Sequence, residues 1–242
     1  MRLTYIYHSG FAIEGENFTI IIDYYRDSDG ENDGIVHDSL LHRAGKLYVL
    51  STHSHSDHFN PEILKWKQYR PDIQYIFSRD ILEDRHVRFD GAVYLSPSEL
   101  YHDNTLCIQA FGSTDVGCSF LIEVAGKLIF HAGDLNNWHW KEESTMEESA
   151  EYEAAYLHEL EILARVTNRF DLVMFPIDPR LGREYMLGAE QFVCRFAVGC
   201  FAPMHFHDQY EKAAAFRSFA EKNGSLFIGW SFPGETVELP DY

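Results

Sequence analysis

The chain lacks the apolar runs that would place it in a membrane or direct it out of the cell. No run reaches the roughly 18 residues that a membrane-spanning helix needs. The N-terminal residues, MRLTYIYHSG, also lack the apolar stretch of a secretory signal peptide. We therefore expect a soluble, cytoplasmic protein without a membrane partner.

Basic residues are also scarce. The chain has 20 lysines and arginines against 38 aspartates and glutamates, and its formal net charge is −18. Binding to nucleic acid depends on basic side chains that displace counterions from phosphates. The charge balance therefore disfavours a nucleic-acid partner, although it leaves room for a local basic pocket that binds a small molecule.

Cysteine is sparse, and the four cysteines form no CxxC pair. Each stands in an apolar stretch, which indicates small buried core residues. A disulfide framework is not expected at this chain length in a cytoplasmic protein.

What is present is a long chain with a large apolar share. Its 242 residues are 45% hydrophobic, which suits one large domain, residues 1–242, better than two small ones. Short β-branched and aromatic runs predict strands, and stretches of helical spacing stand between them, so we expect sheets with interspersed helices. The strands are expected at Leu3–Tyr7, Phe11–Glu14, Phe18–Asp23, Lys46–Leu50, Ile73–Phe77, Ala92–Leu95, Leu106–Phe111, Ser119–Val124, Lys127–His131, Leu172–Phe175, Phe201–Met204 and Leu226–Trp230. The helices are expected after Pro61 and at Glu147–Val166, Ala189–Val198 and Gln209–Lys222, and a hairpin turn is expected at Ala125-Gly126.

The most informative stretch is STHSHSDHF, residues 51–59, which follows an apolar run and precedes a helix start. Neutral imidazole and carboxylate are usual ligands of zinc and similar divalent ions. His53 and His55 alternate across one residue, so on an extended chain their side chains point the same way and can share one ion. Asp57 and His58 can face a neighbouring ion. The alternative is a solvated histidine-rich loop.

Three further places carry candidate groups. In IFHAGDLN, His131 and Asp134 lie at a strand end, where the carboxylate could instead be a structural cap. In APMHFHD, His205 and His207 follow a short apolar run, where hydrogen-bonded core histidines are the alternative. In YHSGF, His8 ends the first strand, and a hydrogen-bonding role is its alternative.

With these motifs in this order, the sequence resembles the metallo-β-lactamase superfamily, whose signature H-x-H-x-D-H matches His53–His58. It is similar to the branch of lactonase-like and uncharacterised metal-dependent hydrolases, which carry GHS after the first strand and HAGD later. Here these are YHSG at residues 7–10 and HAGD at residues 131–134. Asp23 in TIIID and His205 in PMHF match further positions of the family.

The resemblance implies an α/β fold of the α+β type, an αββα sandwich in which two mixed β-sheets pack face to face between outer helices. It also implies a ligand set. His53 and His55 would belong to a first metal ion, Asp134 would bridge two ions, and the second ion would be held by Asp57, His58 and His205. Zinc is the first expectation, and manganese, iron or nickel remain open.

One departure from the family concerns the first ion. The family supplies a third histidine from the strand end that corresponds to Ala110–Ser113, and no histidine stands there. Asp115, His8 or His139 could take its place. Otherwise the first site is weak and one ion remains, or the protein has lost catalysis.

A bound ion lowers the pKa of a coordinated water to about 7, which supplies hydroxide at neutral pH. Asp57 could accept the water's proton or orient it, and His131 or His8 could support a ligand or an oxyanion by a hydrogen bond. Arg180 and Arg183 could bind a carboxylate or phosphate of the substrate, with surface salt bridges as the alternative. His139 stands between two tryptophans that could line a pocket or only pack.

These residues predict a hydrolase that acts on a small, anionic ester, lactone or phosphoester. A nuclease or phosphodiesterase of the same fold is one alternative, and the acidic charge argues against it. A non-catalytic metal-binding or ligand-binding protein with a degenerate first site is the other. The oligomeric state is left open.

Overall fold

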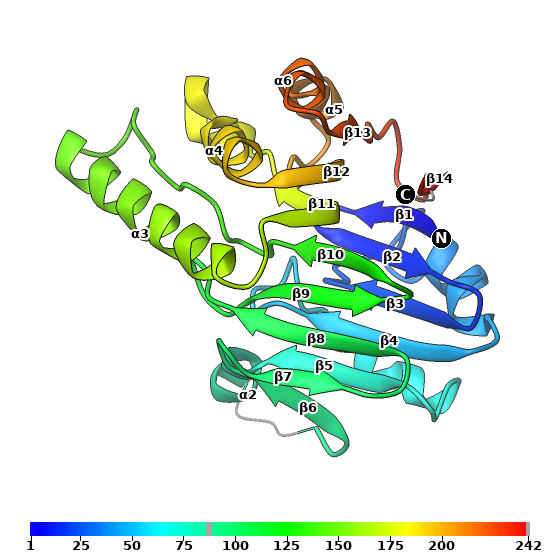
Figure 1. The fold of residues 1–242 in the computed structure, drawn as a ribbon. Coiled ribbons are helices and arrows are strands. Elements are labelled where there is room, and N and C mark those ends of the chain that lie inside the picture. Colours follow the sequence, from blue (N-terminus) through cyan, green and yellow to red (C-terminus); the bar gives the residue numbers. More distant parts are fainter. Residues whose placement is uncertain (86–88, 241–242) are drawn as a thin grey trace. The chain divides into compact units, whose positions relative to one another are not determined.

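The computed structural model describes residues 1–85 and 89–240. The chain divides into two compact units, here called the first unit (Met1–Ser96 with Trp230–Tyr242) and the second unit (Pro97–Gly229). Each unit carries one seven-stranded sheet (Figure 1).

The sheet of the first unit has the strand order β14-β1-β2-β3-β4-β5-β6. Strands β14, β1, β2 and β3 pair antiparallel, and β3, β4, β5 and β6 pair parallel, so the sheet is mixed. Strands β2 and β3 are buried along their whole length, which explains why β3 is apolar except at Thr19 rather than alternating. The strands are β1 (Arg2–Tyr7), β2 (Gly10–Glu14), β3 (Phe18–Ile22), β4 (Lys46–Ser51), β5 (Gln74–Ser78), β6 (Ala92–Leu95) and β14 (Thr236–Glu238).

Short helices pack against one side of this sheet. Val36, Ile63 and Trp66 from the helices join Val49 and Tyr75 from the strands in one buried apolar cluster. The helices are α1 (Ile35–Asp38), η1 (Leu40–His42), η2 (Pro61–Gln68) and α2 (Arg79–Arg85), of which η1 and η2 are 3₁₀ helices. The helix expected after Pro61 is confirmed, with proline in its first turn.

The sheet of the second unit has the order β13-β12-β11-β10-β9-β8-β7 and is also mixed. Strands β7 to β10 pair antiparallel, and β10 to β13 pair parallel. Ala125 and Gly126, with φ of 50° and 74°, form the turn between β9 and β10, so the expected hairpin is confirmed. The strands are β7 (Leu100–His102), β8 (Leu106–Phe111), β9 (Ser119–Val124), β10 (Lys127–His131), β11 (Arg169–Pro176), β12 (Ala197–Met204) and β13 (Leu226–Phe227).

The helices of the second unit are α3 (Met146–Ala164), η3 (Pro179–Glu184), α4 (Leu187–Arg195), α5 (Tyr210–Ala214) and α6 (Arg217–Lys222). The long helix α3 begins with a capping box between Thr145 and Glu148, and it confirms the expected amphipathic helix. Helix α4 packs on β11 and β12 through Phe192, whose ring lies 4.9 Å from that of Phe175. Within residues 1–85 and 89–240, no helix is both long and apolar enough for a membrane span.

Two expected helices differ from the structure. The helix expected at Ala189–Val198 ends at Arg195, because Ala197 and Val198 pair with β11 as the start of β12. The helix expected at Gln209–Lys222 is divided into α5 and α6. Phe216 lies at this division and packs on Phe201, with ring centroids 4.8 Å apart, so a buried contact interrupts the helical spacing.

Two strands were not expected from the sequence, and one is shorter than expected by three residues. Strands β7 and β14 have three residues each and lie at sheet edges, where pairing with β8 and β1 defines them. Strand β13 ends at Phe227 rather than Trp230. The two mixed sheets with interspersed helices confirm the α/β class.

Candidate metal centre

In the first unit, the parallel pairing of β3 and β4 positions the histidine motif (His53–His58). Ile22 pairs with Leu50, so the two strands end at the same edge, with Asp23 beside the start of the motif. Thr52 donates its backbone N–H to Asp23 Oδ1 at 2.7 Å and its hydroxyl to Oδ2 at 2.6 Å. Asp23 therefore anchors the turn that carries the motif.

Asp23 also orients His58. His58 Nδ1 lies 2.7 Å from Asp23 Oδ2, and both residues are completely buried. An ionised carboxylate can only accept hydrogen bonds, so Nδ1 carries the hydrogen and Nε2 keeps its lone pair. Histidines that bind metals in proteins are commonly held this way by a carboxylate. The donor chemistry of His58 thus fits a divalent ion.

Other donors of the first unit lie at spacings that a shared ion would require. His8 Nε2 lies 3.2 Å from Asp57 Oδ2, and ligand atoms of His8, Asp57 and His58 lie within 4.8 Å of one another. His53 Nε2 lies 3.1 Å from His55 Nδ1. Two ligands of one tetrahedral zinc lie roughly 3.4 Å apart. Without an ion, the His53–His55 pair would instead share a hydrogen bond.

In the second unit, three parallel strands end at one edge and deliver a second group of donors. His131 at the end of β10 pairs with Met174 of β11, and Pro176 of β11 pairs with Met204 of β12. The residues that follow these strands include Asp134, Asp178 and His205. His205 Nε2 lies 3.4 Å from Asp134 Oδ1, while His205 Nδ1 lies 2.9 Å from Asp178 Oδ2.

Asp178 holds His205 as Asp23 holds His58. Burial alone would raise the pKa of the Asp178 carboxyl, but hydrogen bonds from His205 and Arg180 outweigh burial and hold that pKa well below its usual range. Arg180 donates Nε to Oδ1 at 3.0 Å and Nη2 to Oδ2 at 2.6 Å. The ionised Asp178 accepts from Nδ1, so His205 presents the Nε2 lone pair.

Three of these residues have a strained backbone. The φ angles of His8, Asp23 and His205 are 57°, 50° and 62°, a region that residues other than glycine rarely adopt. Such a conformation costs about 1–3 kcal/mol and persists where the surrounding structure enforces it, often at functional sites. The surrounding turns therefore hold these three residues in place.

The other histidines predicted from the sequence take local roles in the second unit. His131 is completely buried, and its Nδ1 accepts the Gly133 N–H at 3.1 Å, which shapes the turn toward Asp134. His139 has both ring nitrogens bonded to backbone, with Nε2 donating to the Glu184 carbonyl at 3.1 Å and Nδ1 accepting the Lys141 N–H at 3.2 Å. His139 is therefore positioned as a structural residue.

Arg183 and Asp115 lie at the surface of the second unit. The Arg183 side chain is 95% exposed, and its Nε lies 3.8 Å from Glu142 Oε1. Arg183 also lines a cavity of about 140 Å³ together with Glu184 and Glu190, and these two acidic side chains disfavour an anion there. Asp115 is exposed on the loop after β8.

At the end of β8, where the family histidine is missing, a carboxylate from α3 fills the space beside Gly112. A Cβ atom on Gly112 would meet the Glu159 carboxylate. Burial raises the pKa of the Glu159 carboxyl, and His158 opposes this shift. Sequence reasoning missed Glu159 because α3 is rich in glutamates that belong to its solvated face, and no local signal separates this one.

We expect Asp178→Asn to weaken metal binding about 10–100-fold, the usual effect of removing a carboxylate that orients a histidine ligand. The asparagine amide can donate to Nδ1 and so favour the tautomer with hydrogen on Nε2, which cannot bind an ion. Competition with a chelator measures the affinity. Asp208→Asn, which removes an exposed charge three residues from His205, is the matched control.

Asp178→Asn should also change how the stability of the protein depends on pH. The folded pKa of Asp178 lies below its unfolded value, so its contribution to stability is present above about pH 4 and is lost as the pH falls toward the folded pKa. The unmodified protein should therefore lose more stability than Asp178→Asn between about pH 7 and pH 3. Equal losses in urea titrations would contradict the ionised Asp178.

Comparisons with known proteins agree with the motif. The family described as Beta-lactamase superfamily domain matches residues 2–151. A UPF0173 metal-dependent hydrolase of Pelotomaculum thermopropionicum is 22% identical over 99% of this chain and 100% of that protein. Another protein of this name, from Desulforamulus reducens, is 27% identical over 55% of this chain, and the match spans 62% of that protein, which is less than two thirds of its length.

Solved structures show the same fold. Igni18, a metallo hydrolase from Ignicoccus hospitalis, has a TM-score of 0.68 and 19% identity, with 98% of this chain and 97% of that chain covered. YhfI from Bacillus subtilis, a metallo-β-lactamase fold protein, has a TM-score of 0.63 and 13% identity, with 98% and 99% covered. The two mixed sheets with their helices are thus the metallo-β-lactamase fold, and the chain belongs to the metallo-β-lactamase superfamily of metal-dependent hydrolases.

Proposed function

We propose that the protein hydrolyses a small, anionic ester, lactone or phosphoester with the aid of one or two divalent ions. The observation that carries this proposal is a repeated arrangement. His58 and His205 are each held at Nδ1 by a buried aspartate and so present Nε2 as a metal ligand. When bound, a divalent ion supplies a nucleophile by lowering the pKa of a coordinated water to about 7.

For the ligands, we keep the assignment that the family resemblance implies. His53 and His55 serve one ion, Asp134 serves both, and Asp57, His58 and His205 serve the other. The donor spacings of 3.1–3.4 Å within each unit support this set. His8 is a further candidate, and its position beside Asp57 favours a role with Asp57 and His58 rather than as the missing third histidine of the first ion.

Asp57 is the residue we propose to accept or direct the proton of the attacking water. Its side chain is 34% exposed, whereas His8, His53 and His58 are completely buried. A substrate can therefore approach Asp57 more readily than these histidines. His131 is proposed to act indirectly, because its bond to the Gly133 N–H fixes the turn that carries Asp134.

We propose that Arg180 binds the negative charge of the substrate. Its side chain is 51% exposed even though its guanidinium bonds to Asp178, and the protein otherwise carries a large net negative charge. Support for Arg183, Asp115 and His139 as substrate-binding residues is weaker, since the first two lie at the surface and the third is bonded to backbone. Zinc is the ion proposed first, with manganese, iron or nickel as alternatives, and the cytoplasm is the proposed compartment.

The test combines metal analysis with a substrate screen. Elemental analysis of the purified protein should find at least one divalent ion per chain. Turnover of a lactone, an aryl ester or a phosphodiester should disappear after chelation and return with zinc, manganese, iron or nickel.

Other outcomes distinguish the alternatives. Bound metal without turnover of any of the three substrate classes would favour a non-catalytic binding protein. Cleavage of RNA or DNA in preference to small substrates would favour a nuclease. The absence of any bound ion would contradict the proposal.

A further inference from the structure

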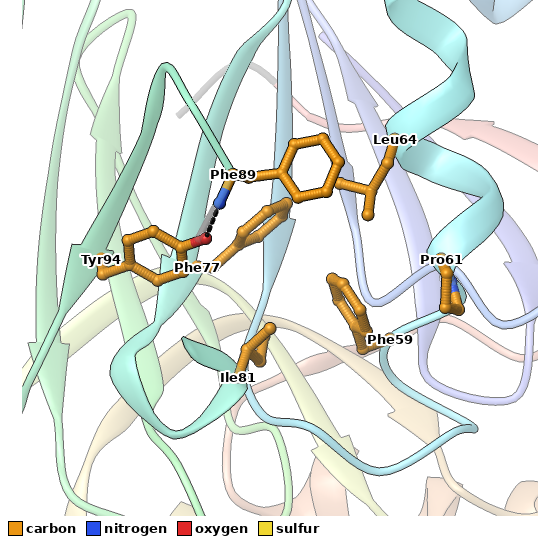
Figure 2. Close-up of a pocket in the computed structure, with 7 residues that line it drawn as sticks. All are labelled: Phe59, Pro61, Leu64, Phe77, Ile81, Phe89 and Tyr94. Carbon is orange, nitrogen blue, oxygen red and sulfur yellow. Dashed lines mark hydrogen bonds between the residues drawn. The ribbon is translucent and has the colours of Figure 1, made fainter. Parts of the chain in front are cut away.

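A cavity of about 220 Å³ lies in the first unit, outside the candidate metal donors (Figure 2). Figure 2 shows the rings of Phe59, Phe77 and Phe89 arranged around this space with the side chain of Leu64. The lining comes from the residue after the histidine motif, from η2, β5, α2 and β6, and from Phe89 in the segment before β6. It consists of Phe59, Pro61, Leu64, Phe77, Ile81, Phe89 and Tyr94.

The described lining residues offer apolar surface and include no Asp, Glu, Lys, Arg or His. The side-chain oxygen of Tyr94 accepts the backbone N–H of Phe89 at 2.9 Å. A charged molecule entering this space would lose its hydration without gaining an ion partner, and that loss is costly. The chemistry of the cavity therefore selects an uncharged, apolar occupant.

The volume of the cavity limits the size of the molecule that can bind there. Protein interiors are close-packed and contain few voids larger than a water molecule, so a cavity of this volume is an exception. An apolar cavity of about 150 Å³ is known to bind benzene. Drug-sized ligands need pockets of about 300 Å³ or more. The volume of 220 Å³ therefore suits one six-membered ring with a short substituent.

The cavity has a buried base and an accessible side. Phe77 and Ile81 are 1% and 3% exposed and form the base. Leu64, Phe89 and Tyr94 are half-buried, and Pro61 is exposed, so a molecule can enter from solvent without opening the core.

Two of the lining residues are connected to the histidine motif, one directly and one through a hydrogen bond. Phe59 directly follows His58, and its N–H donates to the His55 carbonyl at 2.8 Å. Ile81 directly follows Asp80, whose carboxylate accepts the Ser54 N–H at 2.8 Å. An occupant would therefore contact Phe59, the residue directly after the motif.

We propose that this cavity is a binding site for a small, uncharged aromatic molecule of about the size of toluene. The site is separate from the proposed hydrolytic centre, so its occupancy does not depend on which substrate the protein hydrolyses.

Binding of toluene to the metal-loaded protein, followed by ligand-observed NMR, tests the proposal. Leu64→Trp fills the cavity, whereas Tyr69→Trp adds the same ring at a residue that is 59% exposed and ends η2 without lining the cavity. We expect toluene to bind the unmodified protein and Tyr69→Trp equally and Leu64→Trp at least tenfold more weakly. Benzoate, which has the same ring and a charge, should bind the unmodified protein at least tenfold more weakly than toluene.

Ile81→Phe fills the same cavity from α2 and replaces Leu64→Trp if circular dichroism shows that the latter is unfolded. Toluene binding that is unchanged in the folded filling variant would overturn the proposal. Benzoate binding as tight as that of toluene would also overturn it, as would the absence of toluene binding to the unmodified protein.

Discussion

In the His58→Ala variant, we expect metal affinity and metal-dependent turnover to fall by more than about 100-fold. This loss exceeds the 10–100-fold effect of removing an outer partner, because the imidazole itself is the proposed ligand. The change also leaves Asp23 Oδ2 without the Nδ1–H of His58 in a fully buried environment. The buried carboxylate would then take up a proton or accept a hydrogen bond from a water that enters the space of the lost ring, and neither restores a ligand.

Chelator competition and elemental analysis measure this effect without knowledge of the natural substrate. His42→Ala is the matched control, since His42 is exposed in the same unit and belongs to no group of candidate donors. Its metal content should equal that of the unmodified protein. Retention of the full metal content and affinity by His58→Ala would remove the basis of the ligand assignment.

The second large effect is expected for Asp23→Asn, which should weaken metal binding about 10–100-fold and lower the free energy of unfolding by about 1–3 kcal/mol. Asp23 accepts hydrogen bonds from the Thr52 N–H, the Thr52 hydroxyl and His58 Nδ1. An asparagine amide turns one acceptor into a donor, so at least one of these groups loses its bond. Asparagine tolerates the φ of 50° at this position, so the backbone itself is not disturbed.

Urea titration of the metal-free protein isolates the stability effect, and chelator competition gives the affinity. Asp33→Asn removes an exposed charge in the connection between β3 and β4 and serves as the control for charge alone. If Asp23→Asn lost stability but kept the metal affinity of the unmodified protein, Asp23 would anchor the turn without positioning His58.

Much of the fold could be predicted from local sequence. The strands of the first unit from Leu3 to Leu95 were located because apolar runs between turn residues need no long-range information. The boundary between α4 and β12 could not be predicted in this way. Ala197 suits a helix, and only its pairing with Arg169 of β11 makes it the first residue of a strand.

In the candidate site, too, local sequence predicts some features and only the tertiary structure reveals the others. The histidine motif predicts its candidate donors from the sequence alone, because imidazole and carboxylate side chains at this spacing are usual metal ligands. The sequence suggests a substrate-binding role for Arg180 and Arg183 but gives no sign that Asp178, in the same stretch, supports a histidine. The structure shows that Asp178 and Arg180 bond to each other and that Asp178 bonds to His205.

The sequence by itself determined the family and the metal-dependent class of this protein, and it predicted which residues could hold an ion. Only the tertiary structure decided how those residues are supported. The bonds from Asp23 to His58 and from Asp178 to His205 join residues 35 and 27 positions apart. They form because parallel strands bring their carboxyl ends to one edge of a sheet. The order of those strands is set by packing of the whole unit, so it cannot be predicted from any local stretch of sequence.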